Sequence, residues 1–558
     1  MTQGGDMTSA APHPAAAAPH PYTAHTSPAA APHPHTAPTP PDVTIAIAPH
    51  AAPVADVPRR MFGSFVEHLG RCVYGGIYEP DHPTADEDGF RGDVLALTRE
   101  LGVTCVRYPG GNFVSNYNWE DGTGPREQRP VRRDLAWHTT EPNLVGIDDF
   151  HRWSRKAGTE IMLAVNLGTR GLKAALEELE YVNGTPGTAL ADRRVANGIP
   201  EPMDIRMWCI GNEMDGPWQV GHMTPEEYAS AVDKVAHAMK LAESGLELVA
   251  CGSSSAHMPT FGTWERTVLT RAYDNLDFVS CHAYYYERGA RSLQDYLACA
   301  EDMRGFIATV AASADAAREA NHGTKDIALS FDEWGVWYSD VWNRQEAEWK
   351  AAAAEGLHHE PWPFAPHLLE DIYSAADAVV EGSLMITLLK HCDRVRSASR
   401  AQLVNVIAPI MAEPDGGPAW RQTVFYPFAE AAHHARGLAW APAIDSPKVA
   451  TETWGEVDAL DAVVTWDERT RSGLLLAVNR DVTAAHGVTV DLAGLPAAGG
   501  DGVRVARAVV LHDDDPHRQN TADAPETVVP RELPVSTDGA GLCFDLPAVA
   551  WAAVEFTI

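Results

Sequence analysis

Eight short apolar runs that alternate with helix-like segments constrain the fold more than any other feature of this sequence. Each run has the length of a strand, and turn-forming residues separate it from an amphipathic segment. In chain order the runs lie at residues 61–68, 104–111, 160–168, 205–213, 246–254, 276–284, 326–335 and 397–409. Continuously apolar strands are typical of a parallel sheet that is covered on both faces. Eight such units predict an α/β fold, a closed (β/α)8 TIM barrel.

The helical rhythm stops after about residue 440, and the remaining chain predicts a second domain. Segments such as "GLLLAVNRD" and "WAAVEFTI" run apolar or alternate between turn residues. We expect residues 441–558 to form a C-terminal β-sandwich of the jelly-roll-like type and residues 57–440 to form the barrel. The lone strand "DVTIAIAP" precedes the barrel, so residues 42–56 are expected to join the sandwich.

Composition indicates the state of the N-terminal segment and excludes some classes of partner. Residues 1–41 are almost entirely Ala, Pro, His, Thr and Ser, which cannot bury a core, so we expect a disordered tail. The formal net charge of −33 argues against nucleic acid or an anionic membrane surface as a partner. No stretch of eighteen apolar residues occurs, so no membrane span is expected.

The eight cysteines form no CxxC pair and no zinc-like cluster. Several lie inside apolar runs, as in "TCVRY" and "FVSCHAY". We interpret them as buried free thiols, which fits a cytoplasmic protein. Neither a metal nor a cofactor is expected.

Polar residues gather where the strand candidates end. In a (β/α)8 barrel the carboxyl ends of the strands meet at one face, which holds the active site. Seven of the eight runs carry hydrogen-bonding or charged residues at that end: Glu67 and His68, Arg107 and Asn112, Asn166, Asn212 and Glu213, His282 and Tyr284, Asp332 and Glu333, and Gln402 and Asn405. So many polar strand ends predict a pocket.

Two of these residues, Glu213 and Glu333, lie on the fourth and seventh strands, which face each other nearly across a barrel. Two carboxyl groups that flank a scissile bond are the arrangement of glycoside hydrolysis. One must be protonated to help the leaving oxygen depart, and the other must be ionised to attack. Trp137, Trp218 and Trp337 fall in loops after strands, where indole faces suit the C–H surfaces of a sugar ring.

The segments "GSFVEHLGRCVYGGIYEP", "VRYPGGNFVSNYNWEDG", "WCIGNEMDGPWQ", "SFDEWGVWY" and "AQLVNVIAP" together resemble glycoside hydrolase family 51, the α-L-arabinofuranosidases. The matching segments extend from Met61 to Pro409. The resemblance implies a (β/α)8 barrel with a β-sandwich that includes an N-terminal strand. It also implies retaining, exo-acting hydrolysis of terminal α-L-arabinofuranosyl residues of arabinose-containing oligosaccharides and polysaccharides, a role in arabinan catabolism, and a hexamer.

The resemblance assigns roles to individual residues. It makes Glu213 the general acid/base and Glu333 the nucleophile. The residues that it implies bind the furanose, orient the carboxylates or wall the pocket are Glu67, Arg107, Asn112, Trp137, Asn212, Tyr284, Trp337 and Gln402. The segment "CHAYYYERG" is less typical of the family, which leaves open whether Tyr284, Tyr285 or Tyr286 faces the pocket.

Two other functions are compatible with a pair of barrel glutamates. One is a different retaining glycosidase with carboxylates on the fourth and seventh strands, such as a xylanase or a β-glycosidase. The segment "VRYPGGNFVSNYNWEDG" argues against it. The other is a catalytically silent carbohydrate-binding protein, which the presence of both Glu213 and Glu333 disfavours.

Overall fold

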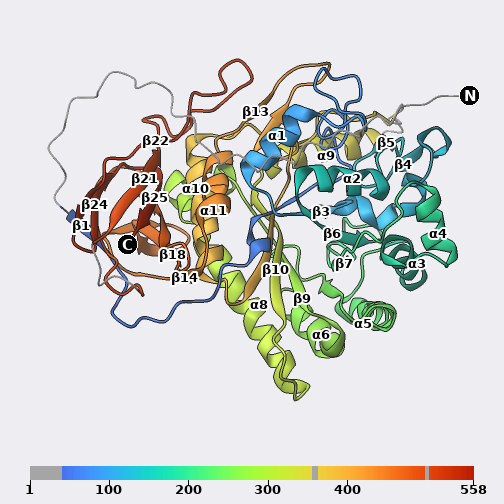
Figure 1. Cartoon of the computed structure of the whole chain (residues 1–558), viewed down its shortest axis with the longest axis horizontal. Coiled ribbons are helices and arrows are strands. Elements are labelled where there is room, and N and C mark those ends of the chain that lie inside the picture. Colours follow the sequence, from blue (N-terminus) through green and yellow to red (C-terminus); the bar gives the residue numbers. More distant parts are fainter. Residues whose placement is uncertain (1–40, 355–361, 497–501) are drawn as a thin grey trace, which may run out of the picture.

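The computed structural model describes residues 41–354, 362–496 and 502–558, and a closed barrel of parallel strands lies at its centre (Figure 1). The order around the barrel is β10-β11-β2-β3-β6-β7-β8-β9. The strands are β2 (Gly63–Phe65), β3 (Cys105–Tyr108), β6 (Glu160–Val165), β7 (Met207–Ile210), β8 (Glu247–Ala250), β9 (Phe278–Tyr285), β10 (Ala328–Val336) and β11 (Val395–Arg400). The predicted (β/α)8 barrel and the location of its eight strands are confirmed.

Helices alternate with the strands, and most of them cover the outside of the barrel (Figure 1). They are α1 (Gly92–Leu101), α2 (Ile147–Ala157), α3 (Leu172–Asn183), α4 (Ala189–Ala196), α5 (Pro225–Ala242), α6 (Thr263–Ala272), α7 (Leu293–Leu297), α8 (Ala300–Ala320), α9 (Ser339–Ala354), α10 (Ala375–Lys390) and α11 (Phe425–His434). Helix α5 shows how local sequence sets a boundary. The Thr224 hydroxyl accepts from the Glu227 backbone N–H, and Pro225 occupies the first turn, where a missing N–H costs nothing.

The last barrel strand is shorter than the sequence predicts. The apolar run extends to residue 409, but β11 ends at Arg400. Asn405 and Ile407 have φ values of 61° and 37°, which a strand cannot accommodate. The apolar side chains beyond Arg400 are buried in a loop instead, and Gln402 therefore lies above the barrel end rather than within a strand.

The C-terminal region consists of two sheets that face each other. The five-stranded sheet has the order β15 (Ala443–Asp445), β1 (Pro41–Ala46), β20 (His486–Asp491), β24 (Gly541–Leu546) and β23 (Ser536–Asp538). The six-stranded sheet has the order β14 (Leu438–Trp440), β18 (Leu460–Asp467), β19 (Ser472–Asn479), β25 (Ala550–Thr557), β21 (Arg504–Leu511) and β22 (Arg531–Glu532). Residues of both sheets share one apolar core, so the predicted sandwich is confirmed.

In the described residues, three two-stranded hairpins lie outside the barrel sheet and the two sandwich sheets. They are β4 (Arg132–Asp134) with β5 (Thr139–Glu141), β12 (Ile410–Ala412) with β13 (Ala419–Arg421), and β16 (Lys448–Thr451) with β17 (Gly455–Asp458). The first hairpin lies in the long connection between β3 and α2, which also holds several predicted site residues.

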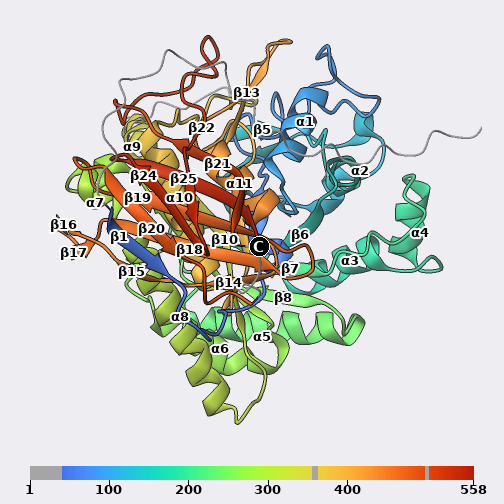
Figure 2. The ribbon, with the colours of Figure 1, turned by 60° about the vertical axis from the view of Figure 1, so that its left-hand side comes forward.

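The six-stranded sheet is buried on both faces, because it packs on the other sheet and on the barrel. Along β25, Ala552 and Val554 belong to the sandwich core, whereas Trp551 and Ala553 belong to the barrel core. Helix α10 lies against this second face, between barrel and sandwich (Figure 1), and nearly all of its side chains are buried. In Figure 2 the sandwich has turned toward the viewer. A Cβ at Gly382 of α10 would lie 2.2 Å from the Trp551 ring, so only glycine lets the indole approach.

Strand β1 joins the five-stranded sheet, parallel to β20 and antiparallel to β15. The prediction of a disordered tail at residues 1–41 lies outside the described residues, except that Pro41 begins β1. The domain boundaries at residues 56 and 440 stay proposals, and β14 already belongs to the six-stranded sheet. In the part of the chain that the structure describes, no helix has the length and apolar character that a membrane span requires.

We predict that Ile45→Ala destabilises the sandwich. Ile45 of β1 is fully buried between the two sheets, and truncating a buried isoleucine to alanine costs about 2–5 kcal/mol. Thermal unfolding should show a clearly lower melting temperature. Thr44→Ala on the same strand is the matched control, because Thr44 is exposed. Equal melting temperatures for both variants would contradict a stabilising role of β1.

Candidate active site

A buried arginine connects three strands at the carboxyl end of the barrel. Arg107 is the second-last residue of β3, and its side chain is 1% exposed. Its Nη1 lies 2.7 Å from Oε1 of Glu333 on β10, and its Nη2 donates to Oδ1 of Asn212 at 2.7 Å. A buried guanidinium needs such partners because an unpaired buried charge is costly. Arg107 therefore fixes one oxygen of Glu333 and leaves the other for a second partner.

That second partner is Tyr284, whose hydroxyl donates to Oε2 of Glu333 at 2.7 Å. Tyr285 points elsewhere, because its hydroxyl donates to Asp302 of α8. The contact with Glu333 distinguishes Tyr284 from its neighbours, which the sequence left open. Burial raises the pKa of Glu333, and the charges of His282 and Arg107 oppose that shift.

Glu213 follows β7 and has a strained backbone. Its φ is 43°, in the left-handed region that non-glycine residues rarely adopt. Its Oε1 contacts Nδ1 of His282 at 2.9 Å, and its Oε2 accepts from the indole N–H of Trp218 at 2.8 Å. Trp218 is 51% exposed, so this second oxygen lies toward the open side of the site.

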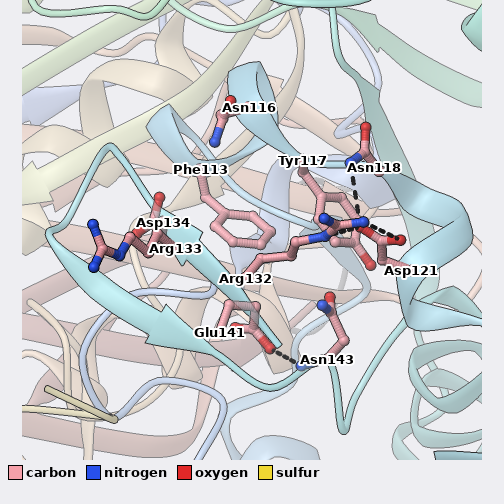
Figure 3. A pocket seen from close by; sticks show the side chains of 10 residues that line it. All are labelled: Phe113, Asn116, Tyr117, Asn118, Asp121, Arg132, Arg133, Asp134, Glu141 and Asn143. Carbon is pink, nitrogen blue, oxygen red and sulfur yellow. Dashed lines mark hydrogen bonds and ion pairs between the residues drawn. The ribbon is translucent and has the colours of Figure 1, made fainter. Parts of the chain in front are cut away.

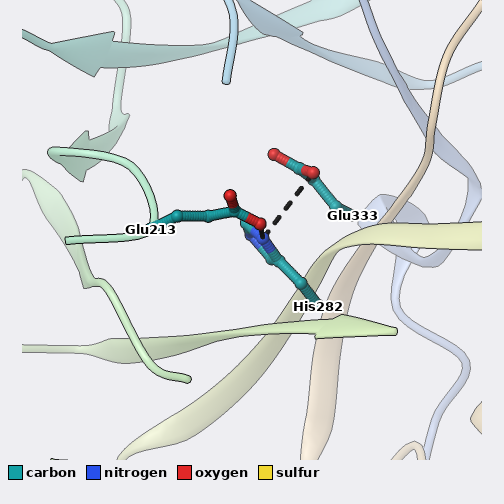
Figure 4. A group of neighbouring side chains, drawn as sticks. All are labelled: Glu213, His282 and Glu333. Atoms are coloured by element: carbon teal, nitrogen blue, oxygen red, sulfur yellow. Dashed lines mark hydrogen bonds and ion pairs between the residues drawn. The ribbon is translucent and has the colours of Figure 1, made fainter. Parts of the chain in front are cut away.

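His282 of β9 lies between the two glutamates (Figure 4). Its Nδ1 is 2.9 Å from Glu213 and 3.6 Å from Glu333, and its Nε2 is 3.3 Å from Asp332. Burial alone would lower the pKa of His282, but the charge of Glu333 and hydrogen bonds to Asp332 and Glu213 raise it to about 10. His282 is therefore an imidazolium at neutral pH.

The group Glu213, His282 and Glu333 has donor atoms within 4.8 Å of one another, a spacing that a metal ion can use. Both ring nitrogens of His282 already have protein partners, however, since Nδ1 lies 2.9 Å from Glu213 and Nε2 lies 3.3 Å from Asp332. Arg107 also occupies Oε1 of Glu333. The chemistry of this donor set favours a pair of carboxyl groups bridged by a cation over a metal centre.

Glu67 follows β2 and lies at the centre of a second hydrogen-bonded cluster. Its Oε1 accepts from the Phe113 backbone N–H at 2.9 Å and from the Trp137 indole at 3.0 Å, and its Oε2 accepts from Gln402 at 3.2 Å. Burial, together with the charge of Glu333, raises the pKa of Glu67 to about 8, although its donors oppose the shift. A Cβ at Gly110 would lie 2.5 Å from Glu67, which explains the glycine.

The remaining predicted residues adjoin these two clusters. Asn212 donates to Oδ1 of Asn112 at 3.3 Å. The Trp337 ring packs edge-on against Tyr284, and the Trp137 ring packs against Trp342 of α9. All ten predicted site residues thus lie in one connected region, while their roles stay predictions.

Three further residues belong to this cluster without having been assigned a role: Trp218 and His282 contact the predicted carboxylates, and Asp332 contacts His282 and Arg107. His282 and Asp332 were visible only as polar strand ends, and Trp218 only as a tryptophan in a loop. Asp332 lies 3.6 Å from Nε of Arg107. Burial opposes its ionisation, but Arg107 and His282 hold the pKa of Asp332 below its usual value. The sequence did contain a signal for this contact. Asp332 and Glu333 are adjacent acids at the end of one predicted strand, and His282 ends the strand before it.

Comparison with known proteins identifies the family of this chain. Residues 97–304 match the α-L-arabinofuranosidase 1 domain, and residues 332–550 match the α-L-arabinofuranosidase C-terminal domain. An intracellular exo-α-(1→5)-L-arabinofuranosidase of Bifidobacterium longum is 76% identical over 92% of each chain. An exo-α-(1→6)-L-arabinofuranosidase of the same organism is 51% identical, over 90% of this chain and 95% of that one.

Solved structures lead to the same family. A family 51 α-L-arabinofuranosidase from Bifidobacterium longum superposes with a TM-score of 0.88 at 73% identity, over 93% of this chain and all of that chain. The chain belongs to glycoside hydrolase family 51. A Thermotoga maritima α-L-arabinofuranosidase, solved as an arabinose complex, superposes with a TM-score of 0.78 at 30% identity, over 93% of this chain and all of the other. The predicted family 51 membership is confirmed.

We predict that His282→Asn moves the acid limb of the kcat/KM profile to higher pH. The asparagine amide replaces Nδ1 but carries no charge, so Glu333 loses a neighbouring cation and its pKa rises further. A nucleophile with a higher pKa is protonated, and inactive, at a higher pH. The shift should be about one unit and is measured by initial rates across pH.

His222→Asn serves as the control, because His222 is exposed in the loop after β7. The same substitution there should leave the acid limb in place. An unchanged limb in His282→Asn, or a shift to lower pH, would contradict the proposed electrostatic coupling.

Proposed function

We propose that the protein is a retaining, exo-acting α-L-arabinofuranosidase that removes terminal non-reducing α-L-arabinofuranosyl residues by double displacement. The observation that carries this proposal is the pair Glu213 and Glu333, whose nearest carboxylate oxygens lie within 4.8 Å. Carboxyl groups about 5–5.5 Å apart are typical of retaining glycosidases, whereas inverting enzymes hold theirs about 6.5–9.5 Å apart to fit a water.

In the first step Glu333 attacks the anomeric carbon while the bond from that carbon to the leaving oxygen breaks. Glu213 donates its proton to this oxygen, so the aglycone leaves as a neutral alcohol. The product is a covalent arabinosyl ester of Glu333. In the second step Glu213, now ionised, takes a proton from water, and the water oxygen displaces Glu333. Two inversions return the original configuration.

The environment of each carboxyl group supports this division of roles. Glu333 has a cation and a hydroxyl donor on its two oxygens, an arrangement that favours the ionised nucleophile. Glu213 presents Oε2 beside the half-exposed Trp218, on the side from which a leaving group departs. His282 contacts both, so it balances charge as the proton moves from Glu213 to the leaving oxygen.

The names of the relatives support proposals on the preferred linkage and the location of the protein. We propose α-(1→5)-linked arabino-oligosaccharides as the preferred substrate, because the 76% identical relative carries that linkage in its name. We also propose a cytoplasmic location and a part in arabinan breakdown, because five bacterial relatives are named intracellular exo-α-(1→5)-L-arabinofuranosidases. The hexamer implied by the family resemblance stays a proposal, which light scattering on the purified protein tests.

We predict that Glu333→Ala abolishes hydrolysis of every aryl α-L-arabinofuranoside, because no covalent intermediate forms. Glu213→Ala should slow substrates with poor leaving groups far more than the dinitrophenyl substrate, whose leaving group departs without a proton. In Glu213→Ala, azide should give an arabinosyl azide of retained configuration. An inverted azide from Glu213→Ala together with a retained azide from Glu333→Ala would reverse the two roles.

We predict hydrolysis of an aryl α-L-arabinofuranoside without added metal, and faster hydrolysis of α-(1→5)- than of α-(1→6)-linked arabinobiose. The comparison uses kcat/KM for both disaccharides, with the aryl β-D-xyloside and β-D-galactofuranoside as controls for the sugar ring. A preference for the α-(1→6) disaccharide would overturn the proposed linkage. Hydrolysis of the xyloside alone would overturn the proposed activity.

A further inference from the structure

The chain turns sharply where β7 ends, and this turn carries Glu213. Gly211 and Glu213 have φ values of 88° and 43°, both in the left-handed region. A non-glycine residue stays in that region only where its surroundings hold it there. Part of the hold comes from the backbone, because the Gly216 N–H donates to the carbonyl of Glu213 at 2.8 Å. The Met223 N–H also donates to the carbonyl of Met214 at 2.8 Å.

The side chain of Asp215 ties the same turn to the neighbouring strand. Asp215 lies two residues after Glu213, and its Oδ2 accepts from the backbone N–H and the hydroxyl of Ser254, at 3.0 Å and 3.1 Å. Ser254 belongs to the loop after β8. The preceding residue, Ser253, donates its backbone N–H at 2.7 Å to Glu265, a fully buried residue of α6. The turn after β7 is therefore anchored to the loop after β8 and, through that loop, to a helix of the barrel wall.

Asp215 also places a negative charge near Glu213. Its Oδ1 is buried and has no hydrogen-bond partner. Burial raises the pKa of Asp215 to about 6; the charge of Glu213 adds to this shift, while the hydrogen bonds from Ser254 and the charge of His282 oppose it. Asp215 is therefore ionised above about pH 6, where its charge opposes a second ionisation nearby.

The other charged groups that act on Glu213 come from β9 and β10. Nδ1 of His282 lies 2.9 Å from Glu213, and Glu333 is a second carboxyl group that interacts with it. Glu333 pairs with the guanidinium of Arg107. Within the described residues, by contrast, the hydrogen-bond donors of Asp215 are the two neutral groups of Ser254. The charge of Asp215 is thus less compensated by its hydrogen-bond partners than that of Glu333.

We propose that Asp215 is a positioning residue for Glu213. Its hydrogen bonds with Ser254 set the direction of the turn that carries Glu213, and its negative charge keeps the Glu213 carboxyl group protonated until the leaving oxygen takes the proton. The inference rests on the proposed function, in which Glu213 is the acid/base. Asp215 acts through Glu213 and has no contact with the reacting atoms.

Two substitutions separate the charge from the anchor. Asp215→Asn keeps an oxygen for the donors of Ser254 and removes the charge, whereas Asp215→Ala removes both. In Asp215→Asn the basic limb of the kcat/KM profile should move to lower pH by about half a unit to one unit, because a negative neighbour no longer opposes loss of the Glu213 proton. The acid limb should stay in place, since Asp215 is neutral below about pH 6 in the wild type.

Asp204→Asn is the control for the pH profile. Asp204 is exposed and precedes β7, so it lies at the opposite end of the strand from Glu213. The same loss of one negative charge there should leave both limbs in place. An unchanged basic limb in Asp215→Asn, or equal shifts in both variants, would overturn the role of the Asp215 charge.

Leaving groups supply the second readout. Asp215→Ala frees the turn, so kcat/KM for aryl α-L-arabinofuranosides with poor leaving groups should fall about tenfold to a hundredfold. The dinitrophenyl substrate should change little, because its leaving group departs without a proton. Asp215→Asn should restore most of the loss, because it keeps the acceptor for Ser254.

Asp134→Ala is the control for this readout. Asp134 ends β4 (Figure 3) and accepts from the backbone N–H groups of Ala136 and Trp137. It therefore anchors a residue of the predicted furanose site instead of the acid/base, and its loss should slow all leaving groups alike. A uniform loss across leaving groups in Asp215→Ala as well would overturn the positioning role and leave the proposed function intact.

Two further outcomes are distinguishable. If Asp215→Ala does not fold, the pH profile of Asp215→Asn still decides, because that variant keeps the hydrogen bonds. Failure of the proposed function has a different signature, namely no hydrolysis of the aryl α-L-arabinofuranoside by the wild-type enzyme.

Discussion

The charge balance around Arg107 is the constraint on which the active site depends. Its guanidinium is buried at the barrel end and has Glu333, Asn212 and Asp332 within reach. His282 adds a second buried cation. Buried ions of one sign are costly without counter-ions. Two cations and three carboxyl groups therefore stabilise one another, and removing any member changes the protonation of the rest. In the proposed mechanism, the same arrangement keeps Glu333 ionised for attack and places Glu213 beside the leaving group.

Packing in the surrounding fold keeps the strands that carry these charged residues in place. Helix α10 is buried on all sides, as expected of a helix that lies between two layers. It packs on the barrel and on the six-stranded sheet, so β25 is buried on both faces. The sandwich thereby stabilises the barrel wall next to β10 and β11, which carry Glu333 and the loop of Gln402.

The connection between β3 and α2 has a different function from the packing elements. Its backbone N–H at Phe113 and its indole at Trp137 both donate to Glu67. Loops positioned by a rigid scaffold are where binding residues concentrate.

The sequence by itself determined the barrel and the sandwich. It also determined that Glu213 and Glu333 lie at the same end of the barrel. Continuous apolar runs have few ways to be buried other than in a covered parallel sheet, and strand ends then meet at one face by topology. Tertiary structure alone decided which of three tyrosines contacts Glu333, that β11 ends at Arg400, and that His282 bridges both carboxyl groups. Periodicity reports which residues are buried but not where a side chain points at a strand end. There, contacts between distant segments fix the rotamers, backbone conformations and protonation states.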